Sequence, residues 1–228
     1  MPKVVAFRES FLRPTETFVR DHLLGLPSWA PEVVTTGIRQ DSLTVDGVPV
    51  HIARRVGLSG RLAWRAAKLV RRPSGPVLAP AVRRAIESVR PDLVHAHFGP
   101  DIAFADLALR GTPYPLIGTF HGYDASVRPD VLASFGWSAK RLAEQGPRLL
   151  NRLAAIITVS GRLRDSLIDR GAPVDRIHVI PCGVRSTEFA WSPPPASGPV
   201  LFVGRLVEKR AVPTSSARWL ESPTHPAP

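Results

Sequence analysis

Residues 92–99 read Asp92-Leu-Val-His-Ala-His-Phe-Gly99. The preceding Pro91 ends a helix, and the short apolar run over 92–95 is predicted to be a buried strand. Its end carries two histidines and then a glycine, which lets backbone N–H groups approach a ligand closely. In an open parallel sheet, ligands bind outside the carboxyl ends of the strands. This segment therefore predicts a parallel sheet with a binding edge at residues 95–99.

The same alternation of short apolar runs and helical patterns extends in both directions from this segment. Strands are predicted over 3–7, 32–36, 48–52, 115–119, 155–159 and 177–180. Helices are predicted over 15–26, 101–110, 129–153 and 160–170, the last capped by Ser160. The first helix places four apolar residues on one face: Phe18, Val19, Leu23 and Leu26. Strands that alternate with helices indicate an α/β fold with a parallel sheet covered by helices.

Two further glycine-containing segments follow predicted strands, Thr119-Phe-His-Gly-Tyr-Asp124 and Pro181-Cys-Gly-Val184. His121 precedes a glycine at a strand end, which favours a ligand-binding role. We interpret His95 as a core histidine with a hydrogen-bond partner. The alternative is a metal site made by His95, His97 and His121. No carboxylate cluster accompanies these residues, so we expect no metal.

The chain is strongly basic, with a formal net charge of +11 and an isoelectric point near 11.2. Such a balance favours anionic partners, although a coding sequence that uses arginine freely would give the same composition. The single cysteine, Cys182, excludes an internal disulfide framework and is typical of a reducing compartment. We expect neither a signal peptide nor a membrane-spanning segment, and a cytoplasmic location.

Residues 61–72 carry the most basic helical pattern of the chain. Four cations share one face of this helix, opposite its aliphatic residues: Arg61, Arg65, Lys68 and Arg72. The pattern is typical of a helix on an anionic membrane surface, which predicts a peripheral position on the inner face of the membrane. A solvated surface face and an acidic protein partner are the alternatives. Nucleic acid is not expected as a partner, because no motif for binding it accompanies the charge.

Taken in order, six segments resemble the N-terminal half of a retaining glycosyltransferase of the GT-B fold, family 4. They are Pro14-Thr-Glu-Thr-Phe-Val19, His95-Ala-His-Phe-Gly99, Thr119-Phe-His-Gly-Tyr-Asp124, Thr158-Val-Ser-Gly161, Ile177-His-Val-Ile-Pro-Cys-Gly-Val184 and Leu201-Phe-Val-Gly-Arg-Leu-Val-Glu-Lys209. The resemblance covers about residues 3–210 and is closest to members found in capsule, exopolysaccharide and O-antigen assembly. It implies a Rossmann-like doubly wound parallel sheet, the acceptor-side half of such an enzyme.

Enzymes of this family move a sugar from a nucleotide diphosphate donor to an acceptor hydroxyl and retain the anomeric configuration. The resemblance implies a nucleotide-sugar donor, a saccharide or lipid-linked acceptor, no cofactor and no metal. It also implies that His121 is the catalytic-site residue and hydrogen-bonds the donor sugar. The donor diphosphate would be bound by Gly204, Arg205 and Lys209, whose cations offset its developing charge. The acceptor and sugar side would be lined by Glu16, Thr17, His97, Gly122 and Asp124.

The resemblance also sets the domain boundaries. Residues 1–191 would form the N-terminal domain, 192–199 a proline-rich linker, 200–210 the first strand and phosphate loop of a second domain, and 211–228 an unstructured tail. Since most of a second domain is missing from this sequence, we expect a glycosyltransferase fragment that is inactive alone. The alternatives are a half-domain that pairs with a separate donor-binding chain, and another sugar-nucleotide enzyme such as an epimerase. The epimerase would need Asp101 and Asp124 as acid and base.

Overall fold

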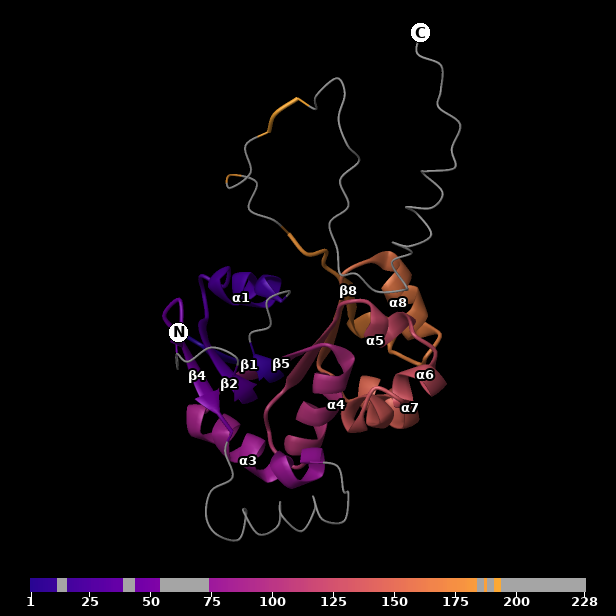
Figure 1. The fold of residues 1–228 in the computed structure, drawn as a ribbon, viewed down its shortest axis with the longest axis horizontal. Helices are drawn as coiled ribbons and strands as arrows, with labels where there is room; N and C mark the ends of the chain where they lie inside the picture. The colour runs from indigo at the N-terminus through magenta and orange to yellow at the C-terminus, as the bar shows by residue number, and fades with distance from the viewer. Residues whose placement is uncertain (12–15, 39–43, 54–73, 184–186, 188–190, 194–228) are drawn as a thin grey trace, which may run out of the picture. The chain divides into compact units, whose positions relative to one another are not determined.

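The computed structural model describes residues 1–11, 16–38, 44–53, 74–183, 187 and 191–193. An eight-stranded sheet with the order β3-β4-β2-β1-β5-β6-β7-β8 runs through residues 3–179 (Figure 1). Seven of these strands pair in parallel, and β3 runs antiparallel to β4. The strands are β1 (Lys3–Phe11), β2 (Ala30–Ile38), β3 (Thr44–Val45), β4 (Val48–Ile52), β5 (Leu93–His97), β6 (Leu116–Phe120), β7 (Ala155–Thr158) and β8 (Ile177–Val179).

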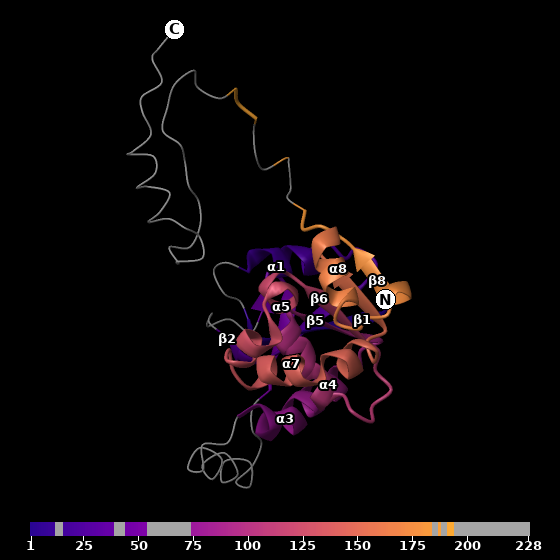
Figure 2. The same cartoon turned by 90° about the vertical axis from the view of Figure 1, so that its right-hand side faces the viewer.

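Helices cover both faces of the sheet. They are α1 (Thr17–Leu24), α3 (Ser74–Val89), α4 (Gly99–Ala108), α5 (Tyr123–Ser126), α6 (Pro129–Ala133), α7 (Trp137–Leu150) and α8 (Gly161–Ile168), followed by a 3₁₀ turn at Val174–Arg176. Because side chains alternate along a strand, Val5 and Phe7 of β1 enter a large core with α3, α4 and α7, whereas Ala6 enters a smaller core with α1. Figure 2 shows α1 and α3 on opposite sides of the strands. The sheet is therefore doubly wound, as predicted.

The direction of winding reverses between β1 and β5, which lie side by side in the middle of the sheet. The chain leaves β1 through α1 to β2 on one side, and later leaves β5 through α4 to β6 on the other. The two strands pair from Val4 with Leu93 to Phe7 with Ala96. In doubly wound sheets, ligands bind at this reversal, outside the carboxyl ends of the strands. The fold thus directs attention to the residues that follow Phe7 and Ala96.

Most predicted elements are confirmed, and β4 has the predicted bounds. Ser160 caps α8 as expected, because its hydroxyl accepts a hydrogen bond from the Leu163 N–H at 3.4 Å. The apolar face of α1 is also confirmed, with Val19 and Leu23 buried and Phe18 packed against the same core. These agreements follow from strong local signals, namely the helix cap at Ser160 and the apolar patterns of β4 and α1.

Several predicted boundaries are wrong. β1 continues to Phe11 beyond the predicted 3–7, and β2 exceeds the predicted 32–36 at both ends. The strand expected over 92–95 continues to His97, since Ala96 and His97 pair with Gly118 and Thr119 of β6. The helix expected over 15–26 begins at Thr17 after Glu16 at the N-cap position. The helix expected over 129–153 is divided into α6 and α7, because Gly136 adopts a φ of 122°, which interrupts the helix.

Several predictions lie outside the described residues. They concern the basic segment 61–72, most of the linker 192–199, and the whole of residues 200–228. Within the ranges that the structure describes, we find no helix that is long and apolar enough to cross a membrane.

Candidate functional site

Four histidines converge at the carboxyl edge of the sheet. His95 and His97 alternate along β5 and therefore point to the same face, with ring centroids 4.3 Å apart in a stacked arrangement. His121 follows β6 and stacks on His97 at 5.4 Å. His22 of α1 meets both strand histidines edge-on, at 5.2 Å from His95 and 5.4 Å from His97. His95 and His97 thus belong to β5 and form part of a cluster of four histidines.

Hydrogen bonds orient the rings of this cluster. His95 Nε2 lies 2.6 Å from Thr119 Oγ1, and His97 Nδ1 lies 3.2 Å from His121 Nε2. The other nitrogen of His97, Nε2, is buried and has no hydrogen-bond partner among the described residues. His95 is therefore a core histidine with a partner, as interpreted from the sequence. His97 has a buried ring nitrogen that no hydrogen bond of the described residues uses.

Burial keeps all four imidazoles neutral. It lowers the pKa of His95 to about 3, with further lowering from His22 and His121. The pKa of His121 falls to about 4 through burial, Arg8 and His22. Burial also lowers the pKa of His22, and it holds the pKa of the fully buried His97 well below its usual range. Near neutral pH the cluster therefore offers lone pairs and N–H donors, and no positive charge.

Arg8 of β1 donates hydrogen bonds to three acceptors next to the histidine cluster. Its Nη1 donates to the His97 carbonyl at 2.8 Å and to Asp101 Oδ2 at 2.6 Å, and its Nη2 donates to Glu16 at 2.5 Å. The Glu9 N–H also donates to Asp101 Oδ2, at 3.1 Å. Burial raises the pKa of Asp101 to about 7, even though the Arg8 charge acts in the opposite direction. We call Arg8, Glu16 and Asp101 the site ion cluster. It links β1 to the start of α1 and to α4.

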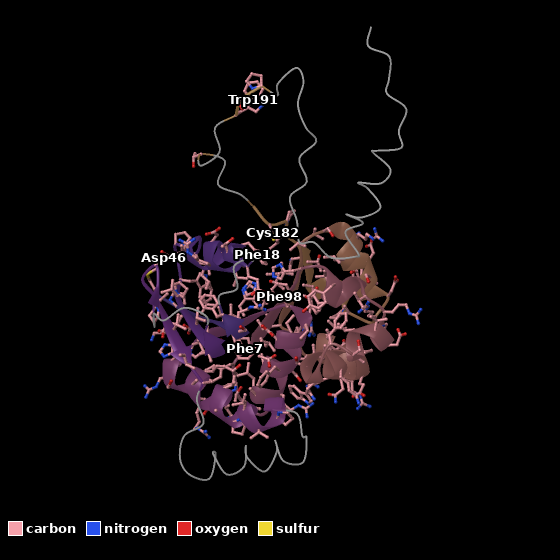
Figure 3. The ribbon with its side chains drawn as sticks, viewed as in Figure 1. Phe7, Phe18, Asp46, Phe98, Cys182 and Trp191 are labelled. Carbon is pink, nitrogen blue, oxygen red and sulfur yellow. The ribbon has the colours of Figure 1, made fainter. Side chains whose placement is uncertain are left out.

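The turn between β5 and α4 is strained where it meets the cluster. Phe98 has a φ of 71°, a left-handed conformation that is uncommon for a bulky residue and frequent at functional sites. Its ring lies 4.3 Å from the Arg8 guanidinium carbon and 4.5 Å from the His121 ring centroid. The ring of Phe18 also contacts His121, with the two ring centroids 4.8 Å apart. Figure 3 labels Phe18 and Phe98. Two phenylalanines thus hold His121 in place.

Asp124 ties two loops together from inside the protein. Its carboxylate accepts the Gly99 and Gly122 N–H groups at 2.8 Å each and the His121 N–H at 3.2 Å. Burial raises the pKa of Asp124, although these backbone hydrogen bonds lower it. A β-carbon on Gly99 would lie 2.4 Å from Leu142 Cδ2 and 3.2 Å from Asp124 Cβ, so a larger residue would require its neighbours to shift. Asp124 therefore fixes the backbone on which His121 is carried.

The structure brings together most of the site residues predicted from the sequence. His97, His121, Gly122 and Asp124 lie at one edge, Glu16 reaches the same region through Arg8, and Thr17 is exposed at the start of α1. Gly204, Arg205 and Lys209 lie outside the described residues.

Sequence reasoning missed Arg8, Phe98 and His22. His22 lies four residues after Phe18, on the helix face already expected to be buried, and that spacing was the available signal. Arg8 lies 89 residues from His97 and 93 from Asp101, so no local pattern links them.

The family follows from comparison with known proteins. The family model of glycosyltransferase family 4 matches residues 29–188, more than half of the 228 residues. The chain belongs to glycosyltransferase family 4. No curated protein matches this family 4 chain.

Three solved structures are similar to the family 4 chain. Anabaena HepE in complex with UDP-glucose gives a TM-score of 0.58 at 20% identity, over 84% of this chain and 46% of HepE. Sucrose-phosphate synthase from Thermosynechococcus elongatus gives 0.56 at 12% identity, over 83% and 50%. A UDP-N-acetylglucosamine 2-epimerase gives 0.50 at 15% identity, over 78% and 47%. The chain thus spans about half the length of these proteins. The fold is that of the N-terminal half of a GT-B glycosyltransferase, as predicted.

Proposed function

We propose that this family 4 chain forms the acceptor-side half of a glycosyl-transfer site in polysaccharide biosynthesis. The donor is a nucleotide sugar, the acceptor is a saccharide or lipid-linked hydroxyl, and the anomeric configuration is retained. The observation that carries the proposal is His121, a neutral imidazole that follows β6 in a family 4 domain. It is held by Asp124, Phe18 and Phe98, and it stacks on His97 of β5. A rigid, uncharged hydrogen-bonding group at this edge suits a sugar hydroxyl better than a phosphate.

Each predicted residue has a part in this proposal. His121 and the Gly122 backbone contact the transferred sugar, and His97 and Asp124 orient His121. Glu16 acts through Arg8, and the exposed Thr17 faces the acceptor. Gly204, Arg205 and Lys209 bind the donor diphosphate, whose charge grows as the glycosidic bond to the sugar breaks. Transfer then depends on bringing the two sets of groups together around the donor.

The proposal can be tested without turnover by saturation-transfer NMR on the full 228-residue chain. UDP-glucose, UDP-N-acetylglucosamine and GDP-mannose are presented in turn. We expect saturation of sugar protons by at least one donor, and its loss in His121→Ala. His178→Ala changes an exposed histidine on β8 and should behave like the unchanged chain. Absence of saturation with every donor, or an undiminished signal in His121→Ala, would count against the proposal.

An epimerase is the second candidate, because one of the similar structures is a UDP-N-acetylglucosamine 2-epimerase. That chemistry needs carboxyl groups that reach the substrate as acid and base. Asp101 and Asp124 are instead buried and engaged, the first with Arg8 and the second with three backbone N–H groups. Together with the family match, this favours transfer. A half-domain that pairs with a separate donor-binding chain would show the same NMR signal and gain activity on mixing.

We also propose a cytoplasmic location with peripheral binding to the inner face of the membrane. The support is the cationic helical pattern of residues 61–72 and the net charge of +11. Binding to vesicles with anionic lipid, and not to neutral vesicles, would test it. Equal binding to both kinds of vesicle would overturn it.

A further inference from the structure

Three of the clustered histidines have the geometry of a metal site. One ring nitrogen of each of His22, His95 and His97 lies within 4.8 Å of those of the other two. The first comes from α1, and the other two alternate on β5, so a helix and a strand present the three rings to one point. We propose that His22, His95 and His97 bind a transition-metal ion of the zinc class. This departs from the expectation of no metal, which considered His121 as the third ligand.

The hydrogen bonds leave one nitrogen of each strand histidine available. His95 uses Nε2 toward Thr119 Oγ1, which leaves Nδ1. His97 uses Nδ1 toward His121 Nε2, which leaves the buried, unpartnered Nε2. Histidine ligands usually engage their second ring nitrogen in just this way, which fixes the tautomer and the ring orientation. Thr119 and His121 are thus the outer partners of the site, and the orphaned nitrogen of His97 points to a ligand.

The chemistry of the ligand set selects the ion. Neutral imidazoles suit Zn²⁺, Co²⁺, Ni²⁺ and Cu²⁺, whereas Mg²⁺ and Ca²⁺ require oxygen ligands. Zn–N bonds of about 2.0–2.1 Å would bring the three nitrogens closer than they lie now. His22 can supply most of this movement, since its side chain is only partly buried on the short helix α1. Three protein ligands leave a fourth position for water.

The metal-site proposal can be tested separately from sugar transfer, because its readouts are metal binding and thermal stability. A metal bound by His22 of α1 together with His95 and His97 of β5 would fix α1 to β5. Its presence would therefore be detected as added thermal stability, with or without turnover.

Cobalt and zinc titrations of the full chain, first treated with EDTA, provide the test. We expect a visible ligand-field spectrum with Co²⁺, displacement of Co²⁺ by Zn²⁺ near one equivalent, and a higher Tm with Zn²⁺. His22→Gln should weaken Zn²⁺ binding at least about 10-fold, and Thr119→Val, which frees the His95 ring, about 10- to 100-fold. His178→Gln is the matched control and should bind as the unchanged chain does.

His22→Gln is the decisive variant, because a partly exposed histidine can be changed without emptying the core. The absence of a cobalt spectrum and of a Zn²⁺-dependent Tm shift in the unchanged chain would overturn the proposal, and the cluster would then bind water or a substrate hydroxyl. Equal Zn²⁺ affinity in the unchanged chain and His22→Gln would also overturn it. Loss of binding in His178→Gln alone would assign the metal to another part of the chain.

Discussion

Two ion clusters with buried carboxylates share helix α4 and differ in their balance of charge. In the site ion cluster, one arginine, Arg8, serves two carboxylates, Glu16 and Asp101. In the second, which we call the far ion cluster, two arginines, Arg141 and Arg152, serve the single carboxylate of Asp106. Asp101 and Asp106 are five residues apart, so they point in different directions from one helix.

The far ion cluster satisfies its carboxylate completely. Arg141 Nη2 donates to Asp106 Oδ2 at 2.7 Å, and Arg152 Nε donates to Oδ1 at 2.7 Å. Arg141 Nε also donates to the Ala103 carbonyl at 3.0 Å. In the site ion cluster, by contrast, Arg8 Nε has no hydrogen-bond partner among the described residues, and the pKa of Asp101 is raised to about 7. Imbalance of this kind is expected at functional sites, and full satisfaction is expected of structural ones.

The largest effect should come from the far ion cluster. In Asp106→Asn, the amide nitrogen must face one of the two arginines, so a buried donor meets a donor. Because Arg141 stays buried and loses its ion pair with the Asp106 carboxylate, we expect a loss of about 3 kcal/mol in the free energy of unfolding. Urea denaturation measures this loss. Asp165→Ala removes an exposed pair with Arg164 and should change the value by less than about 0.5 kcal/mol. Similar losses in both variants would remove the structural role of the far ion cluster.

The histidines and Asp101 should change the free energy of unfolding in opposite directions as the pH falls. Below about pH 6.5 the unfolded chain protonates its histidines, whereas folded His95 and His121, with pKa values of about 3 and 4, do not. The unfolded chain then binds more protons, and stability falls with falling pH. Asp101 acts in reverse between about pH 4 and 7, because its raised pKa lets the folded form bind the proton. Asp124, whose pKa is also raised by burial, acts in the same direction as Asp101. With three or more histidines against these two carboxyls, we expect a net loss of about 1 to 2 kcal/mol from pH 6.5 to 5.5.

Urea denaturation in EDTA at these two pH values measures that loss. His95→Asn should reduce the pH slope by about 1 kcal/mol per pH unit, because one shifted imidazole is removed. The His178→Asn control should leave the slope unchanged. A stability that is flat or rises on acidification would show that the histidines are not buried as a neutral cluster.

The site ion cluster and the far ion cluster also show what could not be predicted from the sequence. The α/β fold, the β4 bounds and the Ser160 cap follow from short-range patterns, and so does the edge that carries His121. Both ion clusters depend on pairs far apart in sequence, such as Arg8 with Asp101 and Arg152 with Asp106. Charged residues of this kind read as surface positions, because only the packed fold brings their partners within hydrogen-bond distance.

The histidine cluster shows a different limit. The sequence predicts that the strand ends at His95 and that His97 follows it, because polar residues beside glycine usually mark the end of a strand. The strand continues because Thr119 and His121 satisfy them from the neighbouring strand and loop. Whether a histidine ends a strand or lies buried within it depends on partners that the local sequence does not specify.

A smaller loss of stability should come from a change at Gly99, the first residue of α4. Gly99→Ala places a β-carbon 2.4 Å from Leu142 Cδ2, 3.0 Å from Phe120 and 3.2 Å from Asp124 Cβ. We expect a loss of about 1.5 kcal/mol from this overpacking, and weaker sugar binding because Asp124 shifts. The matched control is Gly146→Ala within α7, where a β-carbon meets no atom within 4 Å. That change should stabilise the chain by about 0.5 kcal/mol. A stabilised Gly99→Ala would contradict the packing described for Asp124.

The smallest effect should come from Asp101→Asn, the counterpart of the Asp106 variant. The remaining amide oxygen can still accept from Arg8 Nη1 and the Glu9 N–H, which both bind the one oxygen Oδ2. Since the pKa of Asp101 is about 7, the side chain is already half protonated at neutral pH, and the loss should be under about 1 kcal/mol there. At pH 5.5 the aspartate is protonated in the folded chain, so the variant loses the stabilisation that proton binding adds, and its stability should fall more steeply with acid than that of the unchanged chain. Parallel pH profiles for Asp101→Asn and the unchanged chain, measured with urea, would mean that the pKa of Asp101 is not raised and would remove this difference between the two clusters.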